Sequence, residues 1–189
     1  MLFRSTLSTG TGAYGLSQTG GTITNAVTYG NTGSLALSGV TFTGGATATS
    51  ASSLSLGGTI TGGGTLTFGA ATLAANTTLD THAANAGVTL GAITGATKNL
   101  TLSTGSGTIS AAGTSGVGTL AVVGSGTDSF SGSVGASTAD LSGMTGGSVA
   151  FNGGLTAATL STGTGAYGLS DRKSTRLNSS HIPLSRMPS

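Results

Sequence analysis

The chain has 189 residues, a length that suits one domain, and no cysteine, which excludes a disulfide framework. Charged residues make up 5%, against about 25% in an ordinary globular domain, and glycine contributes 36 residues. Thr, Ser and Asn replace the Glu, Lys and Arg of exposed helix faces, so the composition argues against a helical protein and favours β-structure and turns.

One twelve-residue sequence, TLSTGTGAYGLS, occurs twice without substitution, at residues 6–17 and 159–170. The chain between the copies uses the same few residue types, so it reads as an array of repeats. Although the whole chain has a net charge of +2, residues 6–170 carry −2. The charged residues of this region are one base and three acids: Lys98, Asp80, Asp128 and Asp140.

The two ends differ in composition from the repeat array. Residues 171–181, DRKSTRLNSSH, resemble over all eleven positions the translation of a common high-throughput sequencing adapter. Residues 185–189 fit the same reading frame after a variable index, and residues 2–5 resemble the inner end of that adapter on the reverse strand. We therefore expect residues 1–5 to be an adapter-derived scar. We expect residues 171–189 to be an adapter-derived, disordered tail without packed contacts to residues 6–170.

Short runs that alternate apolar and polar residues have the period of a β-strand with one inward and one outward row. Gly-rich breaks separate them, as at Gly57 and Gly58, and we expect turns there. The Ala-rich residues 70–86 are the best helix candidate, but they contain turn-prone residues and lack a charged face. The expected strands are residues 22–24, 26–29, 34–37, 40–43, 53–56, 65–68, 88–90, 99–102, 120–122 and 148–151.

Equivalent apolar residues recur about every 20 positions. Leu35 and Leu54 are 19 residues apart, Leu100 and Leu120 are 20 apart, and Leu120 and Leu141 are 21 apart. This spacing predicts coils of two or three short strands that stack equivalent side chains. We predict an all-β, parallel β-solenoid over residues 6–170, uncapped, with roughly eight coils of roughly 20 residues. The inward residues should include Leu102, Leu120, Val122, Val149 and Phe151.

Segments such as TLTFGAATLAANTTLDT (residues 65–81) and NLTLSTGSGTISAAG (residues 99–113) resemble repeats of very large bacterial surface proteins. These are the filamentous-haemagglutinin-like adhesins and autotransporter passengers. The resemblance covers residues 6–170 and lies in the general Thr/Gly/Ser-rich strand pattern, without a fixed motif. No functional residue is therefore carried over. It implies a right-handed β-helix, secreted or at the cell surface, that acts in adhesion or as a stalk. Residues 1–17 contain no apolar segment typical of a signal peptide, so the expected location depends on this resemblance.

The partners expected for such a chain are neighbouring repeats of the same longer chain, and host or surface glycans or other cells. We expect no nucleic-acid binding. We also expect no membrane insertion, because no run approaches the ~20 apolar residues of a membrane helix. The leading interpretation is a structural or adhesive repeat segment without catalysis.

Both copies of the twelve-residue sequence contain the pattern GxGxxG, at residues 10–15 and 163–168. A dinucleotide fingerprint needs a strand before it, a helix after it and an acidic residue about 20 positions on. Residues 16–21 cannot begin a stable helix, and the first acid is Asp80. We therefore interpret both matches as chance in a glycine-rich chain.

Residues 124–130 resemble part of one calcium-binding nonapeptide, but calcium needs six to eight oxygen ligands and the pattern occurs once. We expect a turn in which Asp128 accepts hydrogen bonds from local backbone N–H groups. Asp80 and His82 could form a base with its orienting carboxylate, yet residues 6–170 supply no second His, Cys or Glu. We expect an exposed turn histidine, and we assign no catalytic, cofactor-binding or metal-binding residue and no cofactor.

Two alternatives remain open. Thr-apolar-Thr triplets at residues 22–24, 41–43 and 59–61 recur after 19 and 18 residues, and a stacked threonine ladder resembles the surface of ice-binding proteins. A polysaccharide-active β-helix enzyme would need clustered acids or bases in a groove, and the scattered acids argue against it.

Overall fold

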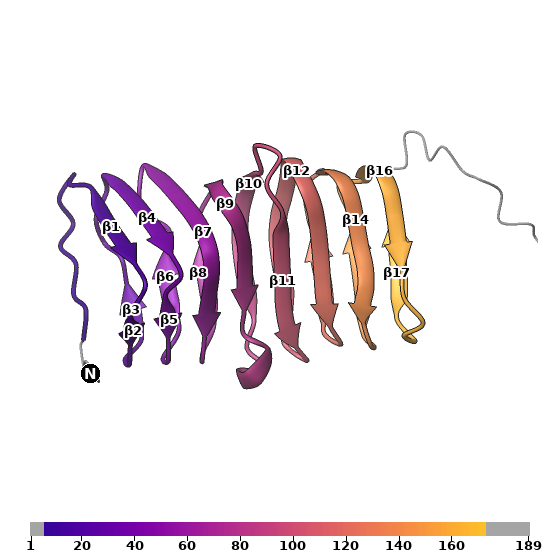
Figure 1. The fold of residues 1–189 in the computed structure, drawn as a ribbon, viewed down its shortest axis with the longest axis horizontal. Helices are drawn as coiled ribbons and strands as arrows, with labels where there is room; N and C mark the ends of the chain where they lie inside the picture. Colours follow the sequence, from indigo (N-terminus) through magenta and orange to yellow (C-terminus); the bar gives the residue numbers. More distant parts are fainter. Residues whose placement is uncertain (1–5, 173–189) are drawn as a thin grey trace, which may run out of the picture.

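The computed structural model describes residues 6–172, which form stacked parallel β-coils (Figure 1). All strands of this region belong to one sheet in which every pairing is parallel. The strands are β1 (Leu16–Thr19), β2 (Thr22–Ile23), β3 (Val27–Thr28), β4 (Ser34–Ser38), β5 (Thr41–Phe42), β6 (Ala46–Ala48), β7 (Ser53–Gly62), β8 (Leu66–Phe68), β9 (Ala71–Asp80), β10 (Val88–Thr94), β11 (Leu100–Gly105), β12 (Ile109–Gly124), β13 (Thr127–Phe130), β14 (Val134–Met144), β15 (Ser148–Phe151), β16 (Leu155–Thr162) and β17 (Gly168–Asp171). The predicted all-β parallel solenoid is confirmed.

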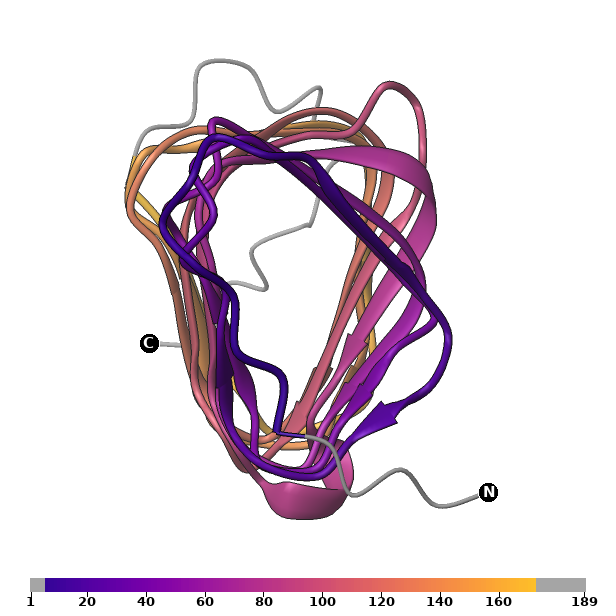
Figure 2. The ribbon, with the colours of Figure 1, turned by 90° about the vertical axis from the view of Figure 1, so that its left-hand side faces the viewer.

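Successive coils lie over one another around a common axis, as the view along that axis shows (Figure 2). We call a set of residues that pair in register from coil to coil a column. The Leu16 column spans eight coils, and its seven steps cover 139 residues, which confirms the predicted coil of about 20 residues. Its members are Leu16, Leu35, Leu54, Ala71, Ile93, Thr114, Val134 and Leu155.

The interior is filled by the apolar row of each strand. Phe130 and Phe151 stack in adjacent coils with ring centroids 5.2 Å apart, and Tyr29 meets Phe42 edge-on at 6.2 Å. Each coil alone buries little, so these contacts between coils supply the core. The predicted inward residues are all 0% exposed, which confirms Leu102, Leu120, Val122, Val149 and Phe151.

All ten expected strands overlap strands of the structure, but the turn expected at Gly57 and Gly58 is wrong. Strand β7 continues through both glycines, and the register against β9 shifts between Leu56 and Gly58. Gly58 has φ of +62°, which lets the chain change direction within a strand. The strands that the alternation did not predict are β1, β6, β9, β13, β14, β16 and β17.

One of the three predicted spacings is also wrong. Leu120 pairs with Ala139 and not with Leu141, because Ala121 pairs with Asp140 and the register shifts only after it. Leu141 therefore continues the row of Val122. Alternation had made Leu141 look equivalent to Leu120, since positions two apart on a strand share a face.

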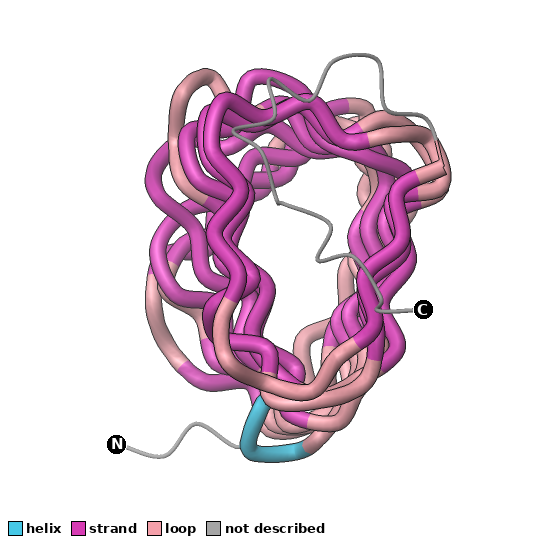
Figure 3. Tube along the Cα trace, turned by 90° about the vertical axis from the view of Figure 1, so that its right-hand side faces the viewer, coloured by secondary structure: helices cyan, strands magenta, loops and turns pink. Residues whose placement is uncertain are grey.

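The Ala-rich residues 70–86 contain strand β9 followed by a short 3₁₀ helix, η1 (His82–Ala84), which is drawn in cyan in Figure 3. Asn85 ends this helix in the left-handed region with φ of 50°. Its backbone N–H donates to the carbonyl oxygen of His82. Residues 70–86 thus lack an α-helix, as expected.

The last described residues contradict part of the expectation for residues 171–189. Strand β17 includes Asp171, which pairs with Phe151, and its Oδ1 accepts a hydrogen bond from the Leu155 N–H at 3.3 Å. The Arg172 N–H donates to the Phe151 carbonyl at 3.2 Å. A free strand edge offers backbone groups to any extended segment, which explains these contacts. The rest of the expected tail, and the expected scar at residues 1–5, lie outside the described residues.

Candidate functional site

One outward column carries a hydroxyl group at seven of its eight positions, with Ala150 as the exception, and we call it the hydroxyl face. It alternates with inward residues such as Leu66 and Val88, so its side chains point away from the core. All its members are half-buried or exposed. They lie on β3, β6, β8, β10, β12, β13, β15 and β17 and are Thr28, Thr47, Thr67, Thr89, Ser110, Ser129, Ala150 and Ser170.

The hydroxyl face has a regular geometry and no ionisable group in its column. Neighbouring members lie about 4.8 Å apart along the stack, because they sit on adjacent strands. Each hydroxyl can donate one hydrogen bond and accept two. Such a row can hold an ordered, hydrogen-bonding surface, but it supplies no acid, base or nucleophile partner for catalysis.

The threonine triplets noted in the sequence do not form one ladder. Thr22 pairs with Thr41, and Thr41 pairs with Thr61, the last residue of the third triplet rather than its first. The third triplet is therefore displaced by two residues, and Phe42 meets Gly62 instead of Ile60. The hydroxyl face is the longer ladder, and the variation of its spacing between 19 and 22 residues concealed it in the sequence.

Neither GxGxxG copy lies in a nucleotide-binding context. Residues 10–15 precede strand β1 directly, and residues 163–168 form the turn between β16 and the start of β17. The required strand–turn–helix order is present at neither copy within the described residues. Both matches are followed by a strand, as the interpretation of a chance pattern expects.

Asp128 does not occupy the turn expected for it. It lies on β13 with its side chain in the interior, 1% exposed, between Ile109 and Val149 of the neighbouring coils. Its Oδ1 accepts a hydrogen bond from the Ile109 backbone N–H at 2.8 Å, so the partner is 19 residues away and not local. Burial raises the pKa of Asp128 to about 6, and the bond from Ile109 acts in the opposite direction.

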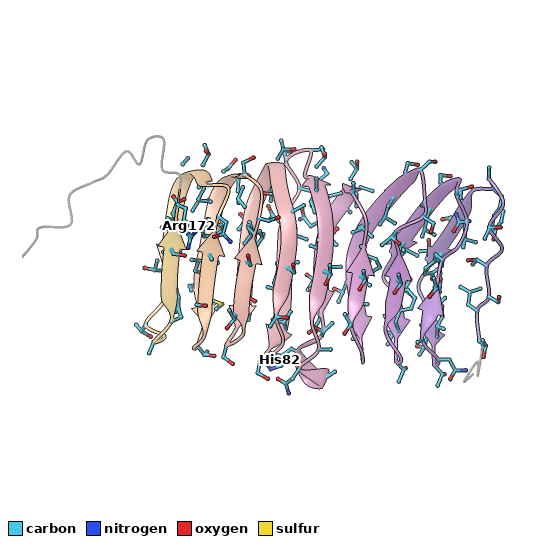
Figure 4. All side chains as sticks on the ribbon, turned by 180° about the vertical axis from the view of Figure 1, so that it is seen from behind. His82 and Arg172 are labelled. Atoms are coloured by element: carbon cyan, nitrogen blue, oxygen red, sulfur yellow. The ribbon has the colours of Figure 1, made fainter. Side chains whose placement is uncertain are left out.

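His82 is exposed on η1, as expected, and its label marks it on the outside of the stack in Figure 4. The Asp80 carboxylate accepts a hydrogen bond from the His82 backbone N–H at 3.0 Å. This bond fixes the turn after β9 and is not a contact between the carboxylate and the imidazole. The Asp80 side chain therefore holds the backbone of the turn between β9 and η1.

The remaining carboxylates are also separated. Thr78, two residues before Asp80, is aligned through Thr101 and Ala121 with Asp140, three coils further along. Three coils correspond to about 14 Å, whereas paired catalytic carboxyls of glycoside hydrolases lie about 5–9.5 Å apart. Within residues 6–172, no three His, Cys, Asp or Glu side chains gather where a metal ion could bind.

The two ends of the described stack expose apolar surface. At the first coil, a cavity of about 350 Å³ is lined by Leu7, Leu16, Gly21, Ile23 and neighbouring polar residues. At the last coil, Leu160 is 37% exposed and Leu169 is 42% exposed. These residues belong to inward columns that have no further coil to cover them within the described chain.

The two identical twelve-residue sequences occupy different positions around the coil. Leu16 begins the Leu16 column, whereas its counterpart Leu169 pairs with Val149 in a different column. A Cβ at Gly12 would meet only the Tyr14 side chain, but one at Gly165 would lie 2.0 Å from a backbone oxygen. The same sequence therefore serves two faces of the coil.

No helix within residues 6–172 is long and apolar enough to span a membrane. Comparison with protein families, with curated proteins and with solved structures finds nothing that matches this chain.

Proposed function

We propose that this chain is a structural or adhesive repeat segment of a large secreted or cell-surface bacterial protein, and that it has no catalytic activity. The observation that carries the proposal is the continuity of the columns, which run from the first coil to the last in inward and outward rows alike. A rod built in this way holds its two ends apart at a fixed distance.

The chemistry of the surface supports the same role. The outward residues are mainly Thr, Ser and small residues, and the acids of the repeat region are used for backbone hydrogen bonds at Asp80 and Asp140 or are buried at Asp128. Hydroxyl-rich, weakly charged surfaces suit contacts with glycans through hydrogen bonds. The expected partners are neighbouring repeats of the same longer chain, and host or surface glycans or other cells.

The test is to amplify the locus from source DNA and to label intact cells with an antibody raised against residues 6–170. The proposal expects further coils before residue 6 and beyond residue 170, and surface labelling without permeabilisation. A short gene that ends at residue 189, or labelling only after permeabilisation, would contradict it.

A second candidate, an ice-binding surface, is favoured specifically by the hydroxyl face. Its first four members are all threonine, at about 4.8 Å intervals. Thr67→Lys should abolish any inhibition of ice recrystallisation, while Thr101→Lys, on a different outward column, should preserve it. Absence of inhibition by the unaltered chain would eliminate this candidate.

A further inference from the structure

We propose that Asp128 makes the contact between strands β12 and β13 a pH-sensitive seam, which is closed in acid and opens locally at neutral pH. By the seam we mean the contacts between residues 109–111 and residues 128–130. The inference goes beyond the proposed function, because it concerns regulation within the coil stack and needs neither the cell-surface location nor adhesion.

The seam contains a carboxyl group in an apolar column. Asp128 is 1% exposed and lies between Ile109, which is 1% exposed, and Val149, which is 0% exposed. The column continues with Val88 and Leu169 on the next strands, and its remaining members are also apolar. Within residues 6–172 the single hydrogen-bond donor to the carboxyl is the Ile109 N–H, at 2.8 Å. When the carboxyl ionises in the closed seam, its charge therefore lies in an apolar interior with one hydrogen bond.

No cation lies on the strands around the buried carboxyl. Strands β10, β11, β12, β15 and β16 contain no ionisable residue. Strand β14 carries Asp140, which alternates with inward residues and points outward, while Tyr167 and Asp171 flank and end β17, two coils away. The cations among residues 6–172, Lys98 and Arg172, lie outside all these strands. Nothing on the surrounding strands therefore neutralises the ionised carboxyl.

The protonation of Asp128 sets the direction of the effect. Burial raises the pKa of Asp128 from 3.8 to about 6, and the hydrogen bond from Ile109 acts in the opposite direction. In the open seam water reaches the carboxyl, so its pKa returns toward the ordinary value of 3.8. The closed seam therefore binds more protons: it is fully favoured below about pH 4, and this preference is lost as the pH rises through 6. One pKa unit is a tenfold change, so opening should increase by at most about 150-fold.

The two walls of this pair of coils are unequal, so the opening is one-sided. At the seam, the backbone register pairs only Ser110 with Ser129 and Ala111 with Phe130. On the other wall of the same coils, β12 pairs with β14 at seven positions, and the two strands lie side by side in Figure 1. Strand β13 also pairs with β15 along its whole length. Strand β13 can therefore separate from β12 while both coils stay attached to the stack.

Opening of the seam also changes the outer surface. Ser110 and Ser129 are neighbouring members of the hydroxyl face, and they pair across the seam. In the closed state they lie about 4.8 Å apart, as residues on adjacent strands do. In the open state this spacing is lost, and the row of hydroxyl groups is divided into two parts. Protonation of an interior carboxyl therefore controls the continuity of an exterior surface.

The test measures amide hydrogen exchange of the full chain by nuclear magnetic resonance between about pH 4 and about pH 8. Protection factors, which divide the intrinsic exchange rate by the measured rate, remove the direct effect of pH on exchange. The N–H groups of Ile109 and Ser131 report on the seam, because both donate hydrogen bonds across it at 2.8 Å. The Thr145 N–H, which donates to the Gly124 carbonyl at 2.8 Å, reports on the other wall of the same two coils.

We expect the protection factors of Ile109 and Ser131 to fall as the pH rises, by at least about tenfold and at most about 150-fold. The protection factor of Thr145 should stay constant. Values at Ile109 and Ser131 that do not change with pH would overturn the proposal. An equal loss at Thr145 would overturn it as well, because the whole contact between the coils would then open and not one wall.

Two substitutions remove the titrating group. Asp128→Asn keeps an oxygen acceptor for Ile109, and Asp128→Val gives the column the apolar residue that it has at Val149. In each variant, protection at the seam should not depend on pH. Asp140→Asn, which changes an outward carboxylate on β14, should retain the pH dependence of the unaltered chain.

Circular dichroism must show unchanged β-structure in each variant, and either Asp128 variant suffices if the other fails this control. PH-dependent protection at the seam in a folded Asp128 variant would overturn the proposal, because another group would then control the opening. Loss of the pH dependence in Asp140→Asn would do the same.

Discussion

The Asp128 carboxylate accepts a hydrogen bond from the backbone N–H of Ile109, one coil away, inside an otherwise apolar row. The two residues belong to strands β13 and β12, whose backbone pairing begins one residue later, with Ser110 opposite Ser129 and Ala111 opposite Phe130. The side chain thus replaces a backbone acceptor between two coils. A carboxyl in this position is favoured when it is protonated, because burial penalises its charge.

Asp128→Asn should change the pH dependence of stability. Burial raises the folded-state pKa of Asp128 from 3.8 to about 6, so its favourable contribution is complete below pH 4 and is lost as the pH rises through 6. The asparagine keeps an oxygen acceptor for Ile109 and does not titrate. Relative to the unaltered chain, the variant should gain at most about 3 kcal/mol between pH 4 and pH 8, measured by urea unfolding.

Asp140→Asn is the matched control, with the opposite sign. Hydrogen bonds from Ser142, first from its side chain and then from its backbone, lower the pKa of Asp140. This carboxylate therefore stabilises the fold above its unfolded pKa and loses that effect as the pH falls. The variant should lose stability relative to the unaltered chain as the pH rises from 3 to 6. Parallel pH profiles for the two variants would refute the inward placement of Asp128.

Leu102→Ala should destabilise the solenoid far more than Leu169→Ala. Leu102 is 0% exposed between coils on both sides, whereas Leu169 is 42% exposed on the last coil. Truncation of a fully buried leucine costs about 2–5 kcal/mol, including the cavity that it leaves. Denaturant unfolding of both variants measures the difference. Equal losses would argue against the register of β11 with its neighbours.

Gly126→Ala should disrupt the contact between two turns. A Cβ at Gly126 would lie 1.9 Å from the Gly107 carbonyl oxygen of the previous coil, and backbone there cannot move without separating the strands. We expect a loss of about 1–3 kcal/mol, typical of overpacking. Gly135→Ala is the control, because its Cβ would meet backbone only at 3.5 Å and its φ is not in the left-handed region. Tolerance of alanine at Gly126 in thermal unfolding would contradict the close stacking of these turns.

The alternation of residues was sufficient to predict the fold class and the inward row, because period two is a local property of a strand. Leu102 and Val122 were predicted correctly from their neighbours in the sequence alone. The register between coils was harder, since coil length varies, and Leu120 meets Ala139 where spacing indicated Leu141. An error of two residues in the register between neighbouring coils keeps the same side chains inward. The hydrophobic pattern of the sequence therefore does not reveal it.

The position of Asp128 and the hydroxyl face could not be predicted for related reasons. Gly124, Gly126 and Asp128 form a turn-like sequence, yet the strand resumes at Thr127 and directs Asp128 inward. Burial of that carboxyl depends on the Ile109 N–H, a partner that only the packing of coils supplies. The hydroxyl face requires the pairings of eight coils at once, and no local pattern encodes them.

The identical sequences at residues 6–17 and 159–170 lie at different angular positions of the coil, a fact with a genetic consequence. The two leucines of each copy are nine residues apart; Leu7 packs against the core, and Leu16, Leu160 and Leu169 lie in inward columns. Recombination between such copies need not respect whole turns, because an out-of-phase insertion still buries its apolar residues. Genes of this kind can therefore lengthen or shorten in fractional turns, and selection can adjust the reach of the rod without rebuilding its interior.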